Sequence, residues 1–231
     1  ERNSGKPIFD VTYNKAPEST IPNEITSPHQ IKLEKPEPFS KIEYSLSDID
    51  KLSEAKQKEI NNPNAMNLAT LGNVLRPRSR IVLLKSHDTS GFVFYTNLNS
   101  RKGINIKENA KVFLNFHWKS LLKQVGIEGE AKLVSNKEAD KYHNSRPESS
   151  RIGAWASDQS SVLKNREELE NNFQTYKKKF EGKKIPRPSH WSGYRVEPDV
   201  IEFWQEMPFR LHDRVEFIKS EKGWIGRRLY P

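Results

Sequence analysis

From Pro63 onward the chain is a succession of short runs rich in β-branched and aromatic residues, and this pattern restricts the folds open to it. Gly, Asp, Asn and Ser separate the runs, which is typical of an antiparallel barrel or sandwich. Strands come from both halves of the chain, so we expect one domain over residues 45–231. The expected strands are Asn67–Leu71, Arg80–Lys85, Gly91–Thr96, Val112–Trp118, Lys123–Val134, Tyr194–Val196, Val200–Trp204, Val215–Lys219 and Trp224–Leu229.

Helices are expected between these strands, which makes the predicted fold mainly β with flanking helices. The longest has apolar residues at i, i+4, i+7 and i+11, the spacing of a helix with one buried face. Asn99 or Ser100 is a suitable N-cap for the first helix. The four expected helices are Ser100–Ala110, Asn136–Ser145, Ser149–Ser157 and Asn165–Phe180.

The beginning of the chain has a different composition. Six of the fourteen prolines lie in the first forty residues, where periodic apolar positions are few, so residues 1–44 are expected to form an irregular arm. After this arm, Leu46, Ile49, Leu52 and Ala55 recur at helical spacing and Pro63 follows. A helix is therefore predicted from Ser45 to Ile60.

Charge and composition narrow the classes of ligand. Lys and Arg number 39 against 30 Asp and Glu, a net charge of +9, which favours an anionic partner: nucleic acid, a membrane surface or a phosphorylated small molecule. The absence of cysteine excludes disulfides, thiolate metal sites and a cysteine nucleophile. No Gly-rich phosphate loop, GxSxG or HExxH motif occurs, so we expect no metal.

The chain has no apolar run long enough to cross a bilayer and no leader-like start, so we expect a cytoplasmic protein that does not bind membranes. Because the sequence begins at Glu1 without a methionine, an upstream targeting segment stays an open alternative.

Basic residues at the start of a predicted helix are the first candidate for a phosphate site. Ser100, Arg101 and Lys102 follow Thr96, and a helix N-terminus attracts anions but repels cations. Cations at this position indicate a bound phosphate, with solvated side chains as the equal alternative. Arg80 and Lys85 bracket another strand and would face opposite sides of it, although an isolated pair of this kind is more often solvated.

Two later segments also carry mixed polar chemistry. Residues 142–160 combine Tyr, Arg, Ser and Gln around an apolar turn, and such donors suit phosphate oxygens. In the tail, a strand containing Arg210, His212 and Arg214 would place all three on one face beside Trp204. A ligand site is the favoured explanation there, and a salt bridge to Asp213 or Glu202 is the alternative.

The motifs RIVLLK, FYTN, SRKG, QVGIEG, HNSRPESSRIGAWAS, IEFWQ and RLHDR occur in this order. From about Asn62 to Pro231, the chain resembles the pyridoxamine 5′-phosphate oxidase family. The resemblance implies an FMN-binding split β-barrel that works as a homodimer, with FMN at the subunit interface. It also implies oxidation of pyridoxamine and pyridoxine 5′-phosphates to pyridoxal 5′-phosphate, with O2 as acceptor and H2O2 as product.

Residue roles follow from the same resemblance, position by position. Arg210 and His212 would be catalytic, with Arg210 orienting the substrate and His212 hydrogen bonding near the reacting group. Gln159 and Ser160 would reach the cofactor from the partner subunit. The implied substrate ligands are Lys85, Tyr142, Arg146, Ser150, Arg210 and His212. The implied FMN ligands are Arg80, Ile81, Val82, Leu83, Leu84, Tyr95, Thr96, Arg101, Lys102, Gln124, Gln159, Ser160, Trp204 and Arg214.

The chain also departs from the family. Asn62 stands where Asp is common, Ser192 stands where a second glycine is usual, and the first sixty residues do not follow the family pattern, so no residues that close over the substrate are assigned there. Three alternatives stay open: a related flavin oxidase of aromatic secondary metabolism such as the phenazine pathway, a non-catalytic flavin or pyridoxal-phosphate carrier, and a basic nucleic-acid-binding barrel. We favour none of them, and we expect no nucleic-acid partner.

Overall fold

The computed structural model describes residues 11–15, 29–33 and 62–231. By its internal contacts the chain divides into a unit of Glu1–Tyr44 and a unit of Ser45–Pro231. In the first unit, β1 (Val11–Lys15) pairs antiparallel with β2 (His29–Leu33). The arm expected to be irregular therefore contains a short two-stranded sheet. The sequence interpretation relied on the many prolines of this segment and did not recognise the two short strands. The helix predicted over 45–60 lies outside the described residues.

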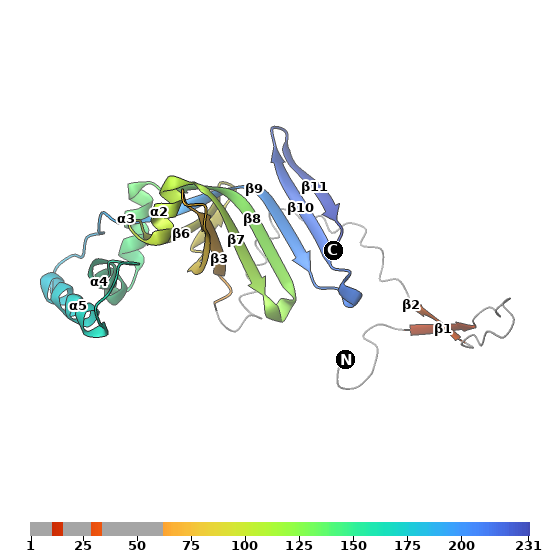
Figure 1. Cartoon of the computed structure of the whole chain (residues 1–231), viewed down its shortest axis with the longest axis horizontal. Helices are drawn as coiled ribbons and strands as arrows, with labels where there is room; N and C mark the ends of the chain where they lie inside the picture. The colour runs from red at the N-terminus through yellow and green to blue at the C-terminus, as the bar shows by residue number, and fades with distance from the viewer. Residues whose placement is uncertain (1–10, 16–28, 34–61) are drawn as a thin grey trace. The chain divides into compact units, whose positions relative to one another are not determined.

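The second unit is built on one antiparallel sheet with the strand order β11-β10-β9-β8-β7-β3-β4, to which β6 adds on β9 and β5 on β6. Figure 1 shows this sheet curling along its length. Its strands are β3 (Ala65–Leu71), β4 (Pro77–Leu83), β5 (Ser86–Asp88), β6 (Gly91–Asn97), β7 (Lys111–Trp118), β8 (Lys123–Leu133), β9 (Trp191–Gln205), β10 (Asp213–Ser220) and β11 (Gly223–Leu229).

Strand β9 is the centre of this architecture, because it pairs with β8 along its length, with β6 near its start and with β10 near its end. The sequence predicted two strands here, which is wrong. Pro198 interrupts the apolar pattern, but Glu128 and Gly129 of β8 pair with Val200 and Pro198, so Asp199 of β9 is an unpaired bulge residue beside the proline and the ladder continues.

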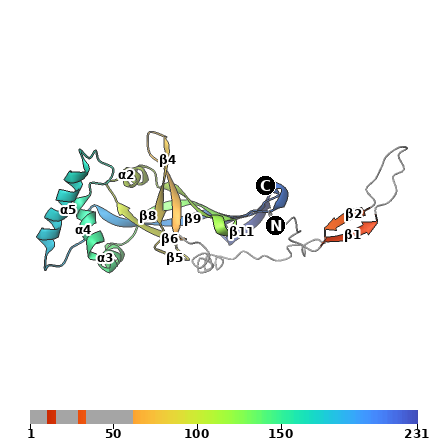
Figure 2. The ribbon, with the colours of Figure 1, turned by 90° about the horizontal axis from the view of Figure 1, so that it is seen from below.

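The helices occur at the predicted places between the strands, which confirms the expected order of helices and strands. They are α2 (Arg101–Glu108), α3 (Asn136–Ser145), α4 (Glu148–Ala156) and α5 (Arg166–Phe180). Both overall views place α3, α4 and α5 at one end of the sheet, away from the β10–β11 hairpin (Figures 1 and 2). Two short 3-10 turns, η2 (Lys119–Leu121) and η3 (Pro208–Arg210), connect strands.

The main core lies inside the curl of the sheet. Alternate residues of β3, β7, β8 and β9 point inward and are almost fully buried, as the period of a strand requires. Val93 of β6 packs against α3, and Ile152 of α4 packs against α5. The expected mainly-β fold with flanking helices is thus confirmed. Among the described residues, no helix combines the length and apolar composition needed to cross a membrane.

Candidate functional site

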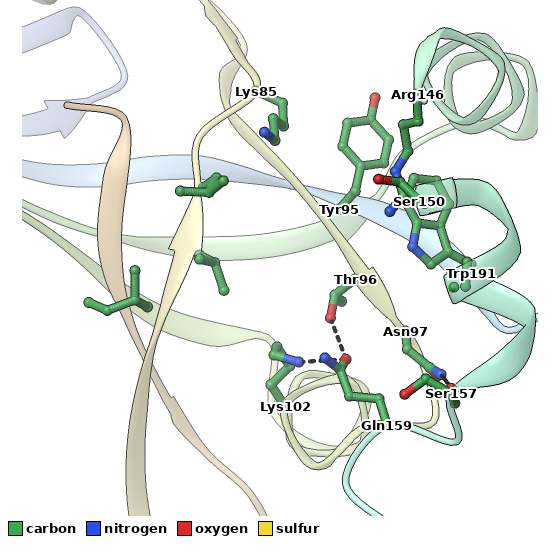
Figure 3. A pocket seen from close by; sticks show the side chains of 15 residues that line it. Lys85, Tyr95, Thr96, Asn97, Lys102, Arg146, Ser150, Ser157, Gln159 and Trp191 are labelled. Carbon is green, nitrogen blue, oxygen red and sulfur yellow. Dashed lines mark hydrogen bonds between the residues drawn. The ribbon is translucent and has the colours of Figure 1, made fainter. Parts of the chain in front are cut away.

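A cavity of about 460 Å³ lies between β4, β6 and the helices at one end of the sheet (Figure 3). One wall is apolar and comes from β4, whereas the other walls are aromatic or polar. The lining residues are Ile81, Val82, Leu83, Lys85, Tyr95, Thr96, Asn97, Lys102, Arg146, Ser150, Gly153, Ala154, Ser157, Gln159 and Trp191.

The end of β6 and the start of α2 form one polar end of this cavity. Ser100 is fully buried and caps α2: its hydroxyl donates to Asn97 O at 2.6 Å and accepts from Gly103 N at 3.4 Å. A Cβ at Gly103 would lie 2.2 Å from Leu98 O, so only glycine lets the chain turn this closely. The predicted helix start is therefore confirmed, with Ser100 as its cap.

Lys102 is the charged group at this end. Its ammonium contacts Ser100 Oγ at 3.1 Å and Gln159 Oε1 at 3.0 Å, and among the described residues it forms no ion pair. Burial and then the nearby Arg80 lower the pKa of Lys102 to about 8. A half-buried cation beside a helix N-terminus, with neutral neighbours, suits a phosphate group.

Arg80 supports this end from outside the cavity. Its guanidinium donates to Leu68 O at 3.1 Å and to Thr70 Oγ1 at 2.7 Å, and burial lowers its pKa, with a smaller effect from Arg78. Arg101 is exposed and does not line the cavity. Of the four residues expected around the FMN phosphate, Thr96 and Lys102 therefore face the cavity in this chain.

An aromatic stack stands at the opposite wall, where Tyr95 and Trp191 line the cavity and Tyr142 does not. The Tyr95 ring lies 4.0 Å from Tyr142 and 5.4 Å from Trp191, nearly parallel to both, and the Arg146 guanidinium lies 4.7 Å from the Trp191 ring. A Cβ at Gly193 would come within 2.7 Å of the Tyr95 ring, so glycine permits this stack. Burial, followed by Glu138, raises the pKa of Tyr95 to about 12, so its phenol stays neutral.

Figure 3 shows two polar groups at separate ends of the cavity. Lys102 and Gln159 lie at one end, and Lys85, Arg146 and Ser150 lie at the other. The apolar side chains of Ile81, Val82 and Leu83 line the same cavity, and Ile81 is 64% exposed. Leu84, also expected to contact the cofactor, is instead buried in the core.

The remaining predicted residues form a second cluster on other strands. Gln124, Trp204 and Arg214 are register neighbours on β8, β9 and β10, and the His212 ring lies 4.7 Å from Trp204. None of these residues, nor Arg210, lines the cavity within the described part of the chain. The predicted site thus has two separate parts. One is the cavity, and the other is the strand row, formed by Gln124, Trp204 and Arg214 side by side on β8, β9 and β10.

Arg210, His212 and Arg214 were expected to lie on one face of a strand, and this expectation is wrong. Strand β10 begins only at Asp213, and Phe209 and Arg210 have positive φ angles of 60° and 62° in the turn after Pro208. Arg214 makes a two-pronged ion pair with Glu202 at 2.7 and 3.0 Å, which is the alternative that the sequence disfavoured.

Gln159 is expected to reach the cofactor from a partner subunit, which stays a prediction; within its own chain it contacts the start of α2 and the end of β6. Its Oε1 accepts from Lys102 Nζ and lies 3.4 Å from Thr96 Oγ1, because the segment after α4 returns over the start of α2. Ser160 is exposed, has a positive φ of 77° and does not line the cavity.

The sequence reasoning missed Asn97, Ser157 and Trp191 as cavity residues. Asn97 Nδ2 donates to Ser157 O at 3.4 Å, which ties β6 to the end of α4. Asn97 is the last residue of the FYTN motif and could have been indicated by it, whereas the place of Trp191 depends on how β9 pairs with β6. Ser192, where the family usually has glycine, is buried opposite Thr96 in that ladder.

Known proteins share both the sequence and this architecture. A family model described as pyridoxamine 5′-phosphate oxidase matches residues 52–180, and a pyridoxine 5′-phosphate oxidase C-terminal dimerisation region matches residues 191–231. A pyridoxine/pyridoxamine 5′-phosphate oxidase of Pelagibacter ubique is 51% identical over 182 residues, covering 78% of this chain and 88% of the relative. Its counterpart in Caulobacter vibrioides is 51% identical over 180 residues, covering 78% of this chain and 81% of the relative.

Solved structures agree with the sequence comparisons. PhzG from Burkholderia lata, in complex with tetrahydrophenazine-1-carboxylic acid, superposes with a TM-score of 0.75 at 31% identity, covering 79% of this chain and 90% of that one. A pyridoxamine 5′-phosphate oxidase-related, FMN-binding protein from Nostoc punctiforme has a TM-score of 0.65 at 12% identity, covering 80% and 97%, and shows the fold alone. The expected split barrel is thereby confirmed, and the chain belongs to the pyridoxamine 5′-phosphate oxidase family.

Proposed function

We propose that this protein is an FMN-dependent oxidase that converts pyridoxamine and pyridoxine 5′-phosphates to pyridoxal 5′-phosphate, with O2 as electron acceptor and H2O2 as product. One observation carries the proposal: a single cavity has two separate cationic ends with an apolar wall beside them. A phosphorylated cofactor and a phosphorylated substrate need such an arrangement. Relatives at about half identity carry the name of this activity.

The end formed by Thr96, Lys102 and Gln159 fits the FMN phosphate. The free N–H groups of the first turn of α2 and the Lys102 ammonium supply donors and positive charge, and Arg80 adds charge from behind. Ile81, Val82 and Leu83 offer apolar surface for a flat ring, which explains why Ile81 is so exposed in the chain alone. When bound, FMN supplies two-electron redox chemistry between the substrate and dioxygen.

The end formed by Lys85, Arg146 and Ser150 fits the substrate phosphate. One terminal nitrogen of Arg146 is buried without a hydrogen-bond partner among the described residues. This N–H donor can therefore bond to an acceptor on a bound ligand. The Trp191 ring holds this guanidinium in place, whereas Tyr142 stacks on the Tyr95 ring and does not line the cavity. Two cations and a hydroxyl suit a dianionic phosphate.

We infer a homodimer with FMN at the subunit interface. The C-terminal dimerisation region spans β9 to β11, the same elements that carry Trp204, Arg210, His212 and Arg214 outside the cavity. A second copy would add this row to the cavity of the first. Arg210 then orients the substrate, and His212 donates from Nε2, because its Nδ1 accepts the Met207 N–H at 3.3 Å.

The test is a visible absorption spectrum of the purified protein after reconstitution with FMN, followed by an assay for pyridoxal 5′-phosphate. We expect a yellow protein that forms the product with matching consumption of O2. A colourless protein, or a yellow one without turnover, would refute the proposal. Arg210→Ala should keep the bound flavin and lose turnover, whereas a non-catalytic carrier would keep all its properties.

The likeness to PhzG supports a second candidate, a flavin oxidase of tricyclic aromatic acids. Lys85, Arg146 and Ser150 at one end of the cavity argue against it, since a ligand without phosphate would leave two cations uncompensated. A substrate panel of pyridoxamine 5′-phosphate, dephosphorylated pyridoxamine and a dihydrophenazine acid separates the candidates, because only the second would prefer the last compound.

A further inference from the structure

His143 of α3 is a buried histidine that the proposed chemistry does not use. Its side chain is fully shielded from solvent, and neither ring nitrogen has a hydrogen-bond partner among the described residues. It lies between Tyr142 and Arg146, two residues assigned to the substrate phosphate. A buried polar ring without partners needs an explanation.

Its contacts lead to Arg146 by two routes. The His143 and Trp191 rings pack edge to face, with centroids 5.3 Å apart and planes at 70°, while the Arg146 guanidinium lies over the same Trp191 ring at 4.7 Å. In addition, the Arg146 backbone N–H donates to His143 O at 3.2 Å where α3 ends. His143 therefore fixes both the backbone of Arg146 and the surface on which its side chain rests.

The charges around His143 keep its ring neutral. Asp140 acts on it from α3, Arg146 from the residue that follows α3, Arg151 from α4 and Arg187 from the segment before β9. Burial, followed by Arg146, Arg151 and Arg187, lowers the pKa of His143 to about 4, against a smaller opposing effect of Asp140. Asp140 forms an ion pair with Arg187, whose guanidinium also donates to the backbone oxygen of Trp191 at 2.8 Å.

We propose that His143 is a positioning residue, whose neutral ring locks Trp191 so that the Arg146 guanidinium is held ready for the substrate phosphate. The inference rests on the proposed function, because it takes Arg146 as a phosphate ligand. What the position requires is an uncharged aromatic edge against Trp191. Loss of that edge leaves a void beside Trp191, into which the indole moves and takes the guanidinium with it.

The experiment compares His143→Ala and His143→Phe in the FMN-loaded full-length protein. We expect His143→Ala to raise KM for pyridoxine 5′-phosphate about tenfold with kcat changed less than about threefold, since the contact concerns binding rather than chemistry. Phenylalanine restores the aromatic edge, so His143→Phe should stay within about twofold of the wild type. His87→Ala is the matched control, because it removes a histidine of β5 whose ring stacks on Phe92. It should not change KM.

A double-mutant cycle decides whether His143 acts through Arg146. Once Arg146→Ala has raised KM, adding His143→Ala should raise it no further, because no guanidinium is left to position. Additive effects would overturn the proposal, as would a KM for His143→Ala equal to that of the wild type. Failure of the proposed function looks different, since the wild type would then show no turnover. The near-ultraviolet circular dichroism of the substrate-free protein, altered in His143→Ala and restored in His143→Phe, tests the Trp191 contact on its own.

Discussion

Raising the pH from 7 to 9 should weaken FMN binding, because Lys102 loses its proton in the empty site. The ammonium is half-buried, has neutral hydrogen-bond partners and lies near Arg80, and its pKa is therefore lowered to about 8. A bound phosphate dianion favours the charged amine and raises this pKa again. Above pH 8, binding must consequently be accompanied by uptake of a proton.

The size of the effect follows from the two pKa values. With a pKa of about 8 in the empty site and a much higher one in the complex, the dissociation constant rises about tenfold between pH 7 and 9, about 1.4 kcal/mol. Below pH 7 the amine is charged in both states, so its contribution to the pH dependence disappears.

The assay is titration of the flavin-free protein with FMN, followed by the change in flavin fluorescence at several pH values. Lys102→Arg stays charged and should bind at pH 7 with no slope up to pH 9. Lys102→Met should bind more weakly and also without slope. Lys107→Met, an exposed lysine in the last turn of α2, is the matched control and should keep the wild-type slope. A wild-type affinity that stays constant from pH 7 to 9 would refute the role given to Lys102.

Three further changes test how the fold supports the site. Gly193→Ala places a Cβ 2.7 Å from the Tyr95 ring and should lower the free energy of unfolding by about 1–3 kcal/mol, measured by urea denaturation. Ser100→Ala removes the α2 cap and should cost about 1 kcal/mol in the same assay, with the exposed neighbour Asn99→Ala as a neutral control. On acidification, the unfolded chain takes up a proton at His143 before the folded protein does, because the pKa of His143 is lowered in the folded protein. Lowering the pH from 6.5 to about 4 should therefore destabilise the wild type by up to about 3 kcal/mol more than His143→Phe. Equal acid sensitivity of the two proteins would contradict the buried neutral ring.

Local signals in the sequence were sufficient for most of the secondary structure. The helix predicted over Asn136–Ser145 has the same bounds as α3, because the hydroxyl of Ser135 caps its start and apolar spacing fixes its buried face. The strand predicted over Gly91–Thr96 differs from β6 by one residue. Capping and alternation act within a few residues, so they can be recognised without knowing the partner elements.

Features that depend on a partner element were missed. Pro198 indicated a break in β9, but whether a strand tolerates a proline depends on its register with the neighbouring strand, here a shift between Glu128 and Gly129 that leaves Asp199 unpaired. Likewise, a shared face was expected for Arg210, His212 and Arg214 on the assumption that this stretch is extended. The left-handed turn at Phe209 and Arg210 is unusual for such side chains and no local pattern indicates it.

The candidate site shows the same division. Thr96 and Lys102 could be predicted, since a helix N-terminus with cations beside it is a local pattern with a physical meaning. The roles of Trp191 and Gly193 arise only because β9 runs beside β6 and brings them against Tyr95. Arg80 illustrates a third case: its charge was recognised, but its hydrogen bonds to Leu68 and Thr70 place it behind the cavity rather than in it.

The separation of the cavity from the strand row has a consequence for how this fold builds a site. Gln124, Trp204 and Arg214 are aligned across β8, β9 and β10 by backbone pairing alone, and the Glu202 carboxylate fixes the Arg214 guanidinium before any ligand binds. The row is therefore preorganised in each chain, yet none of its three residues lines the chain's own cavity, which β9 borders at Trp191, the opposite end of the strand from Trp204. Since the dimerisation region contains β9 to β11, the contact that joins two copies and the contact that would complete the cavity belong to the same strands. Ligand binding and subunit association should then stabilise each other. A ligand that contacts both the cavity of one copy and the strand row of the other binds the dimer more tightly than the single chain.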